Sequence, residues 1–412
     1  MITLTDSAQC CGCSACKSIC GHHAITMEED DKGFLYPRVN KDLCVDCGLC
    51  EKVCPFINQN SGRLPASVYA AKNIDVEIRK QSSSGGIFTV LAEYVINKGG
   101  VVFGAKFNEE WQVVHGLTED LEGIKDFRGS KYVQSVVGET YSQARKFLLQ
   151  GRLVLFTGTP CQILGLKNFL HKEYDNLLTL EVFCHGVPSP KIWREYLNDT
   201  ISTISKAEKK SGSLPQDAKL AITAISHRDK RLGWKKFGIV VRGNVVEGEK
   251  ESGASAVNSE KTFLQQEQYQ NPYLKCFISN VYLRPSCHAC KVKSGSSGAD
   301  FALADFWGID RHCHSFSDNY GVTLLYAVSE KASEIIDSMP IEKVELNNVE
   351  YLTLNRAYTK SAVKNKYSDL FWKKYQHEGI SALYSVSEML KPTLIQKIKT
   401  SIRNTIKKMI LR

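Results

Sequence analysis

The sequence lacks the marks of a membrane-spanning, fibrous or disordered chain. No run reaches the roughly 18 uncharged apolar residues that a spanning helix needs, and the first residues, MITLTDSAQCC, contain neither the basic nor the apolar segment of a secretory signal. With only 29 glycines and 11 prolines in 412 residues, collagen-like and low-complexity sequences are excluded. The composition, 43% hydrophobic and 24% charged, predicts a cytoplasmic globular protein of two to three domains.

Excess positive charge is scarce outside the C-terminus. The formal net charge is +9, but seven Lys and Arg residues and no acidic residue fall within 391–412, so the rest of the chain carries only +2. This excludes the broad basic surface of a nucleic-acid-binding protein. Apolar residues recur at steps of three and four between Leu394 and Ile410. That pattern predicts a basic amphipathic helix, which binds either an anionic membrane surface or a protein surface.

Cysteine is abundant, and its distribution argues against disulfides. Nine of the 15 cysteines lie within the first 54 residues, and in a reducing cytosol such density indicates metal or cluster ligation. Two runs share the spacing C-x2-C-x2-C-x3-C, which is typical of bacterial ferredoxins with two 4Fe-4S clusters, and in that pattern the fourth cysteine binds the other cluster. The predicted ligand sets are Cys10, Cys13, Cys16 and Cys54 for one cluster, and Cys20, Cys44, Cys47 and Cys50 for the other.

Some residues of this region fit the pattern less closely. Gly21 stands where the motif has proline, whereas the second run ends on Pro55. Cys11 breaks no spacing and is interpreted as a bystander thiol. Paired cysteines also bind zinc, but a zinc site does not require the third cysteine and the longer final step in both runs. Residues 24–37 predict a β-hairpin, and residues 58–65 predict a linker.

Beyond the linker, strands and helices alternate, which predicts an α/β layer with a largely parallel sheet. Residues 205–219, rich in Ser, Lys and Gly, predict an exposed loop or insertion. Strands are expected at 68–71, 100–104, 153–157 and 179–182, and helices at 87–97 and 141–150. The expected domains are residues 1–58, 67–200, 201–345 and 346–412.

Two polar loops of this body are candidates for binding an anionic cofactor. The first, Ser83-Ser84-Gly85-Gly86, precedes the helix expected at 87–97, where hydroxyls and free N–H groups suit a phosphate, although serine before a helix is commonly just a cap. The second loop combines two cations, a hydroxyl and an aromatic ring. It consists of Arg128, Gly129, Ser130, Lys131 and Tyr132. It is interpreted either as a second wall of the same site or as an exposed polar loop.

Four later cysteines form a further candidate ligand group. Cys161 and Cys184 each follow an expected core strand, and Cys287 and Cys290 form a C-x2-C pair. Four thiols suffice for a third 4Fe-4S cluster or for one zinc ion. Buried structural cysteines are the alternative interpretation.

Taken together, these motifs resemble the family of coenzyme F-420 hydrogenase/dehydrogenase β subunits, in the form that carries an N-terminal two-cluster ferredoxin domain. Besides the cysteine runs and the two polar loops, the resemblance rests on residues 158–162, 184–188, 228–230 with Gly233 and Trp234, 284–287 with Cys290, and 304–308. It implies a bacterial-type two-cluster ferredoxin domain of α+β type, followed by a mixed α/β domain that binds FAD and iron-sulfur. The basic amphipathic helix expected from the apolar spacing then ends the chain.

The resemblance also implies roles for individual residues. The four later cysteines become ligands of a third 4Fe-4S cluster beside the flavin, and the two polar loops become FAD contacts. Lys131 or Arg128 is expected near N1 of the flavin, where a cation stabilises the reduced ring. His185 and Asp229 are the candidates for proton delivery.

The sequence leaves two functions in competition. One is an iron-sulfur flavoprotein oxidoreductase that passes electrons between 4Fe-4S clusters and FAD to reduce or oxidise an organic substrate or hydride carrier, with polysaccharide biosynthesis as one setting. Its redox partner is expected to be ferredoxin, F-420 or a nicotinamide carrier. The alternative is an electron-transfer β subunit that serves a separate catalytic subunit. Either acts in the cytoplasm, or at the inner face of the membrane if the C-terminal helix binds lipid.

Overall fold

The computed structural model describes residues 1–246, 260–346 and 355–391 of the chain. Apart from Lys391, the amphipathic helix predicted over 391–412 lies outside the described residues. Within these three ranges, no helix has both the length and the apolar character needed to cross a membrane.

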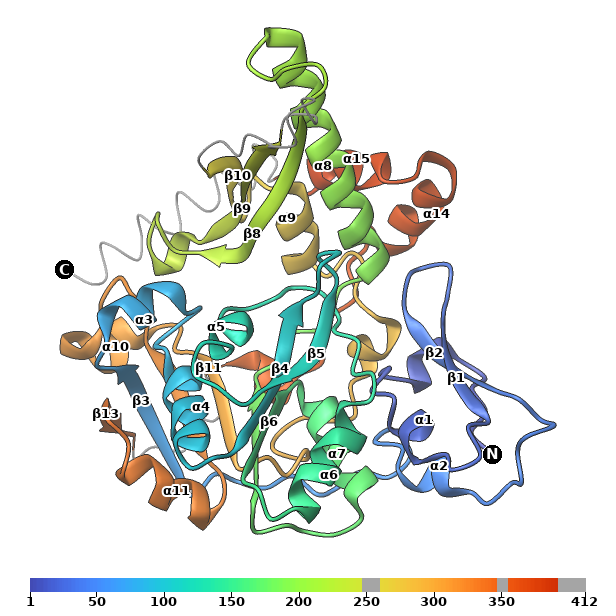
Figure 1. The fold of residues 1–412 in the computed structure, drawn as a ribbon, viewed down its shortest axis with the longest axis vertical. Helices are drawn as coiled ribbons and strands as arrows, with labels where there is room; N and C mark the ends of the chain where they lie inside the picture. Colours follow the sequence, from blue (N-terminus) through green and yellow to red (C-terminus); the bar gives the residue numbers. More distant parts are fainter. Residues whose placement is uncertain (247–259, 347–354, 392–412) are drawn as a thin grey trace, which may run out of the picture.

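A small N-terminal module lies against one side of the body, beside α6 and α7 (Figure 1). Its elements are η1 (Ser7–Gln9), α1 (Ala15–Ile19), β1 (Ile25–Glu29), β2 (Leu35–Val39) and α2 (Leu49–Lys52). β1 and β2 pair antiparallel, which confirms the predicted hairpin. Asp30 closes the turn between them by accepting hydrogen bonds from the backbone N–H groups of Lys32 and Phe34, at 3.1 and 2.8 Å. The third cysteine of each run lies inside α1 or α2.

An eight-stranded sheet forms the centre of the body, in the order β13-β3-β12-β11-β7-β6-β4-β5. Its strands are β3 (Ser67–Asn73), β4 (Val101–Phe107), β5 (Val113–Thr118), β6 (Val154–Gly158), β7 (Leu177–Val182), β11 (Phe301–Asp305), β12 (Thr323–Ala327) and β13 (Ile341–Glu345). The inner four, β11, β7, β6 and β4, are parallel, and every pairing outside them is antiparallel. The prediction of a largely parallel sheet is therefore wrong for both flanks. A fully buried strand such as β12 is apolar whether it pairs parallel or antiparallel, so its sequence does not give its direction.

Helices cover both faces of this sheet, so its central strands are apolar on both sides. One face packs on α4 (Ile87–Asn97), α5 (Ile124–Phe127) and α11 (Glu330–Asp337), and the other on α6 (Thr140–Leu149) and α7 (Pro160–Leu170). In β6, Leu155 enters the first core and Phe156 the second, as the alternation of a strand requires. The short helices α3 (Val76–Gln81) and α10 (Ile309–His312) lie at strand ends.

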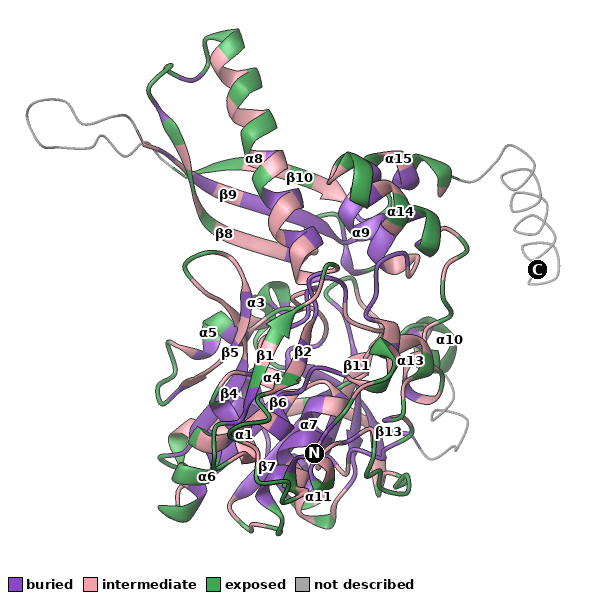
Figure 2. Ribbon diagram, turned by 90° about the vertical axis from the view of Figure 1, so that its right-hand side faces the viewer, coloured by how far each residue is buried: buried purple, intermediate pink, exposed green. Residues whose placement is uncertain are grey.

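A second unit stands at one end of this sheet (Figures 1 and 2). It contains the antiparallel sheet β10-β9-β8 and helices that flank it. Its elements are α8 (Pro190–Ser211), β8 (Lys219–Asp229), η2 (Trp234–Lys236), β9 (Gly238–Val246), β10 (Lys261–Glu267), α9 (Pro272–Ile278), α14 (Ser368–Glu378) and α15 (Ser381–Met389); η3 (Pro285–Ala289), η4 (His314–Phe316) and α13 (Arg356–Thr359) complete the described elements.

The expected loop at 205–219 is partly wrong, because α8 continues to Ser211. The helix ends at Gly212, whose φ of 77° suits the left-handed end of a helix. The Ser- and Lys-rich composition belongs to the end of this helix, where exposed and half-buried residues alternate (green and pink in Figure 2).

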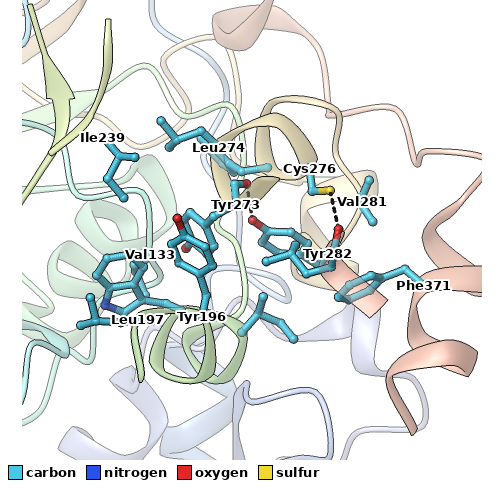
Figure 3. Close-up of a cluster of buried hydrophobic side chains, with 14 of the residues drawn as sticks. Val133, Tyr196, Leu197, Ile239, Tyr273, Leu274, Cys276, Val281, Tyr282 and Phe371 are labelled. Atoms are coloured by element: carbon cyan, nitrogen blue, oxygen red, sulfur yellow. Dashed lines mark hydrogen bonds between the residues drawn. The ribbon is translucent and has the colours of Figure 1, made fainter. Parts of the chain in front are cut away.

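Buried tyrosines pack among aliphatic side chains in the core of the second unit (Figure 3). The hydroxyl of Tyr282 donates to the carbonyl of Tyr273 at 2.5 Å, and that of Tyr273 donates to the carbonyl of Tyr132 at 2.6 Å. Cys276 lies in the same core, where burial raises the pKa of its thiol to about 12. The hydroxyl of Tyr273 therefore anchors the backbone of the loop at 128–132 to this core. Cys276 acts in the core as an apolar side chain.

Candidate functional site

The two N-terminal cysteine loops repeat one backbone shape. Gly12 and Asp46 occupy equivalent places between the first and second thiols and have φ of 71° and 50°. Between the second and third thiols, Ser14 and Gly48 have φ of 64° and 74°. Left-handed steps at matched positions curl each loop around its cysteines, and the N–H of Gly12 lies 3.3 Å from the Sγ of Cys10. Such loops, whose N–H groups face sulfur, suit an iron-sulfur cube.

The first predicted ligand set is gathered in space. Burial raises the pKa of the Cys16 thiol to about 12, and Cys10 and Cys54 add to the rise. Cys13 lies within electrostatic reach of both Cys16 and Cys54. The chain thus brings Cys54, from the second run, to three cysteines of the first run, as the crossed pattern requires. We call this group the proximal set: Cys10, Cys13, Cys16 and Cys54.

The second predicted set lies further from the body. Cys50 is buried beside Cys16 and accepts a hydrogen bond from the N–H of Ile2 at 3.3 Å, and Cys20 packs on the same small apolar cluster. Cys47 is exposed. This group, the distal set, therefore has one side open to solvent. Its members are Cys20, Cys44, Cys47 and Cys50.

The four later cysteines also converge, although they come from three segments. Cys161 lies at the start of α7, Cys184 follows β7, and Cys287 and Cys290 flank the end of η3. Burial raises the pKa of the Cys184 thiol to about 12, with Cys161 and Cys290 adding to the rise. Cys287 has Cys184, Cys161 and Cys290 as its electrostatic neighbours. This group is the third set.

Cys11 joins the proximal set to the third set. Its thiol is buried and lies beside those of both Cys13 and Cys161. The close approach also explains a glycine in α7, because a Cβ at Gly165 would lie 3.1 Å from the Sγ of Cys13. Spacing alone gave Cys11 no role, since its position between the two sets depends on the docking of the module.

No three His, Cys, Asp or Glu side chains in the described ranges converge as a single metal ion needs. A cube of four irons takes one thiolate at each iron, so its four ligands need not share one point. Sets of four separate thiols around a concave loop fit that larger group.

A cavity of about 670 Å³ opens beside the third set, and this volume suits a cofactor or small ligand. Its floor is formed by the carboxyl ends of β6, β7 and β11, where ligands bind in open α/β sheets. Arg228, Phe237 and Phe277 of the second unit line the opposite side of the cavity. Cys184 belongs to its lining and so connects cavity and thiols.

The two polar loops predicted as cofactor contacts meet in this cavity. The Ser83 Oγ accepts from the N–H of Ser130 at 2.7 Å and lies 2.8 Å from its Oγ. Gly85 is required by close packing, because a Cβ there would lie 2.4 Å from the carbonyl oxygen of Ala71. The predicted loop residues that line the cavity are Ser83, Ser84, Gly86, Arg128, Gly129, Ser130, Lys131 and Tyr132.

The three side chains predicted to be catalytic have different surroundings. Lys131 lines the cavity, and burial lowers its pKa to about 7; its Nζ donates to the carbonyls of Asp126 and Arg128 at 2.7 and 3.1 Å. His185 also lines the cavity. Asp229 is absent from the lining, and its carboxylate is bound by Arg231 at 2.9 Å at the end of β8. The structure therefore brings two of the three to the cavity.

Arg228 and Asp305 were not assigned to the site from the sequence, yet both line the cavity. Arg228 is buried, and its Nη1 contacts Asp305 Oδ2 at 2.8 Å. Its Nη2 has no hydrogen-bond partner among the described residues. Trp307 stacks on Trp234 at 5.0 Å and is 41% exposed. The signal available in the sequence was the motif at 304–308, which begins at the end of β11.

A buried histidine under the second polar loop predicts a pH effect on stability. His227 Nδ1 accepts from the N–H of Tyr132 at 2.8 Å, and burial lowers its pKa from 6.5 to about 3. Since the unfolded chain binds the proton more readily, this stabilisation is full above pH 6.5 and is lost as pH falls toward 3. Burial also lowers the pKa of His115, to about 4, so His115 likewise stabilises the fold less as the pH falls.

We expect thermal unfolding of wild type to shift steeply to lower temperature between pH 6.5 and 4, since burial opposes protonation of the two histidines by about 3 to 5 kcal/mol each. His227→Asn, which keeps an acceptor for Tyr132, should flatten that dependence. An equal pH slope in both proteins would show that His227 does not contribute.

Comparison with known proteins assigns this arrangement to a class. Residues 9–58 match the model of a 4Fe-4S dicluster domain, so the N-terminal module is of the iron-sulfur class. Residues 68–140 and 151–351 match the N-terminal and C-terminal models described as coenzyme F420 hydrogenase/dehydrogenase, beta subunit. The chain belongs to this family, which confirms the resemblance and the ferredoxin domain predicted from the motifs.

Two curated relatives are similar over about half of the chain. One subunit of the F(420)H(2) dehydrogenase of Methanosarcina mazei is 26% identical over 223 residues, 49% of this chain and 62% of its own length. The coenzyme F420-dependent sulfite reductase of Methanocaldococcus jannaschii is 27% identical over 203 residues, 47% of this chain and 30% of its own length. The chain thus spans less than two thirds of either relative.

One solved structure, a xenon derivative of the F420-reducing NiFe hydrogenase complex from Methanosarcina barkeri, contains a similar chain. It is 19% identical, with a TM-score of 0.40, and the alignment covers 80% of this chain and 92% of that one.

Proposed function

We propose that this chain is an iron-sulfur flavoprotein oxidoreductase in which FAD occupies the cavity and the third set holds a third 4Fe-4S cluster. The observation that carries the proposal is the succession of thiols. It begins at exposed Cys47, passes through the buried neighbours Cys50 and Cys16, crosses Cys11 to Cys161, and ends at Cys184 on the cavity wall. Bound clusters supply single electrons, and bound flavin links them to two-electron hydride chemistry.

The lining of the cavity has what such a cofactor needs. The start of α4, with Ser84, Gly86 and Ile87 in the lining, offers backbone N–H groups at a positive helix end to the diphosphate. Arg228 offers its unpartnered Nη2, held in place by Asp305 and by Ser83, whose carbonyl accepts from Nε at 3.1 Å. Apolar side chains supply the rest of the wall, as ring systems require.

His185 is the proposed proton donor and acceptor in the cavity. Its Nε2 lies 2.5 Å from the Oδ1 of Asn280, and the Nδ2 of Asn280 donates to the carbonyl of Val363 at 2.9 Å. Because that second bond fixes the amide orientation, Nε2 must carry the proton in the neutral ring. Nδ1 is then left to accept a proton.

The proposed reaction partner is a hydride carrier of the F-420 or nicotinamide type, which stacks on the flavin from the open side of the cavity. Family membership and the F-420-related names of the relatives support F-420. A sugar-type substrate from polysaccharide biosynthesis has no comparable support. The alternative is an electron-transfer subunit with a separate catalytic partner, and the subunit status of the dehydrogenase relative favours it.

These two functions differ in turnover by the purified chain. The anaerobically prepared protein would be reduced with ferredoxin and offered F-420, NAD or NADP, with a viologen dye as a control for electron transfer alone. The oxidoreductase predicts reduction of one carrier at a rate that saturates with carrier concentration. Dye reduction without reduction of any carrier would favour the subunit.

A further inference from the structure

One buried cation lies between the proximal and third sets without a partner of opposite charge. Arg284, just before η3, is fully buried. Its Nε donates to the carbonyl of Cys10 at 2.7 Å, its Nη1 to the Oε1 of Gln134 at 3.0 Å, and its Nη2 to the carbonyl of Leu35 at 2.9 Å. All three acceptors are neutral. Within the described ranges, no carboxylate forms an ion pair with it.

The guanidinium is fixed by more than these bonds. Its Cζ lies 4.3 Å from the ring centroid of Tyr36 and 5.4 Å from that of Phe34. A Cβ at Gly12 would lie 2.7 Å from Nη1, so the first cysteine loop rests directly on the cation. Gln134 continues the contact, because its Nε2 donates to the carbonyl of Cys11 at 2.9 Å.

Burying this charge costs free energy unless negative charge lies nearby, because a buried cation loses its hydration. One carboxylate within electrostatic reach, that of Asp30, already accepts two backbone hydrogen bonds in its hairpin turn. Arg284 instead lies within electrostatic reach of Cys161 of the third set, and its Nε reaches the backbone of Cys10 of the proximal set. A cluster bound by four thiolates carries net negative charge, so each of the two adjoining sets supplies the missing partner once loaded.

We propose that Arg284 is a positioning residue that places one buried positive charge between the proximal and third clusters and raises the reduction potential of both. The charge favours the reduced, more negative form on each side. It also ties the docking of the ferredoxin module to the electron path, since the same side chain binds the module through Cys10 and Leu35. This inference rests on the proposed third cluster, but its effect on the proximal cluster does not.

The test is a potentiometric titration of the anaerobically purified full chain, followed by electron paramagnetic resonance of each cluster. Gln134→Glu places a carboxylate against the guanidinium and loses only the bond from Nε2 to the carbonyl of Cys11, whereas Gln134→Met removes both hydrogen bonds of Gln134 without adding charge. The proposal predicts that Gln134→Glu lowers the reduced-to-oxidised ratio at fixed potential about tenfold, or about 59 mV, for the proximal and third clusters. Gln134→Met should leave the reduced-to-oxidised ratio of both clusters within about twofold of the wild-type value.

Two further comparisons separate charge from structure. Arg284→Gln should lower the same two potentials and Arg284→Lys should retain them, while the distal cluster, which no hydrogen bond of Arg284 reaches, serves as internal reference. If Arg284→Gln does not assemble clusters, the Gln134 pair decides the question. Equal shifts in Gln134→Glu and Gln134→Met, or no shift in either, would overturn the proposal. If the wild-type protein shows the signals of the proximal and distal clusters but none from the third cluster, that result would instead count against the proposed function.

Discussion

Replacing Cys184 by serine is expected to reduce the iron content from about twelve to about eight atoms per chain, because one of three four-iron clusters loses a thiolate ligand. The two ferredoxin clusters should remain, since their ligands come from the N-terminal module. Electrons entering at those clusters should then reach the flavin far more slowly, because the third set stands between Cys11 and the cavity. Iron and sulfide analysis, with rapid-mixing absorbance of the flavin, measures both effects.

Cys313→Ser is the matched control for this variant. Cys313 is half-buried at the end of α10 and lies in another apolar cluster, away from all three sets. It should leave iron content and flavin reduction unchanged. The account is contradicted if Cys184→Ser keeps twelve irons, or if both variants lose iron alike.

Replacing Arg228 by glutamine is expected to weaken flavin binding at least tenfold while the iron content stays at its wild-type value. A hydrogen bond from a charged donor contributes roughly 1.5 to 3 kcal/mol, and the Arg228 Nη2 is the unpartnered donor on the cavity wall. Flavin released on dialysis, measured by absorbance and fluorescence, reports the loss. Arg228→Lys, which retains the charge beside Asp305, should lose less.

Loss of flavin through general damage has to be separated from loss of this contact. Breaking a buried ion pair costs about 3 to 5 kcal/mol of stability, so Arg228→Gln should also unfold at a lower temperature. Arg231→Gln offers the control, because Arg231 pairs with Asp229 in the next turn but does not line the cavity. Retention of flavin in Arg228→Gln would remove Arg228 from the proposed site.

The motif positions that the sequence singled out are close together in space for a physical reason. The inner strands of the sheet are parallel, so the loops after β6, β7 and β11 emerge on one edge, and Cys184 reaches the cavity there. The same rule did not extend to Asp229. It ends a strand of the second, antiparallel sheet, and its carboxylate turns to Arg231.

Other features depend on contacts between segments far apart in the chain. Cys11 and Arg284 have roles only because the ferredoxin module docks on α7 and η3, and no spacing rule encodes that docking. The strand directions on the flanks of the sheet were missed because buried strands of either direction are equally apolar. Arg228 and Asp305 stand in motifs that were recognised, but their ion pair joins β8 to β11, which are distant in the chain.

The central claim is that three thiol sets and one cavity hold three clusters and a flavin. Anaerobic purification followed by iron, sulfide, zinc and flavin analysis tests it most directly. The account predicts about twelve irons, about twelve sulfides and one FAD per chain, with no stoichiometric zinc. About eight irons without flavin, or zinc at the third set, would contradict it and would leave a two-cluster electron carrier.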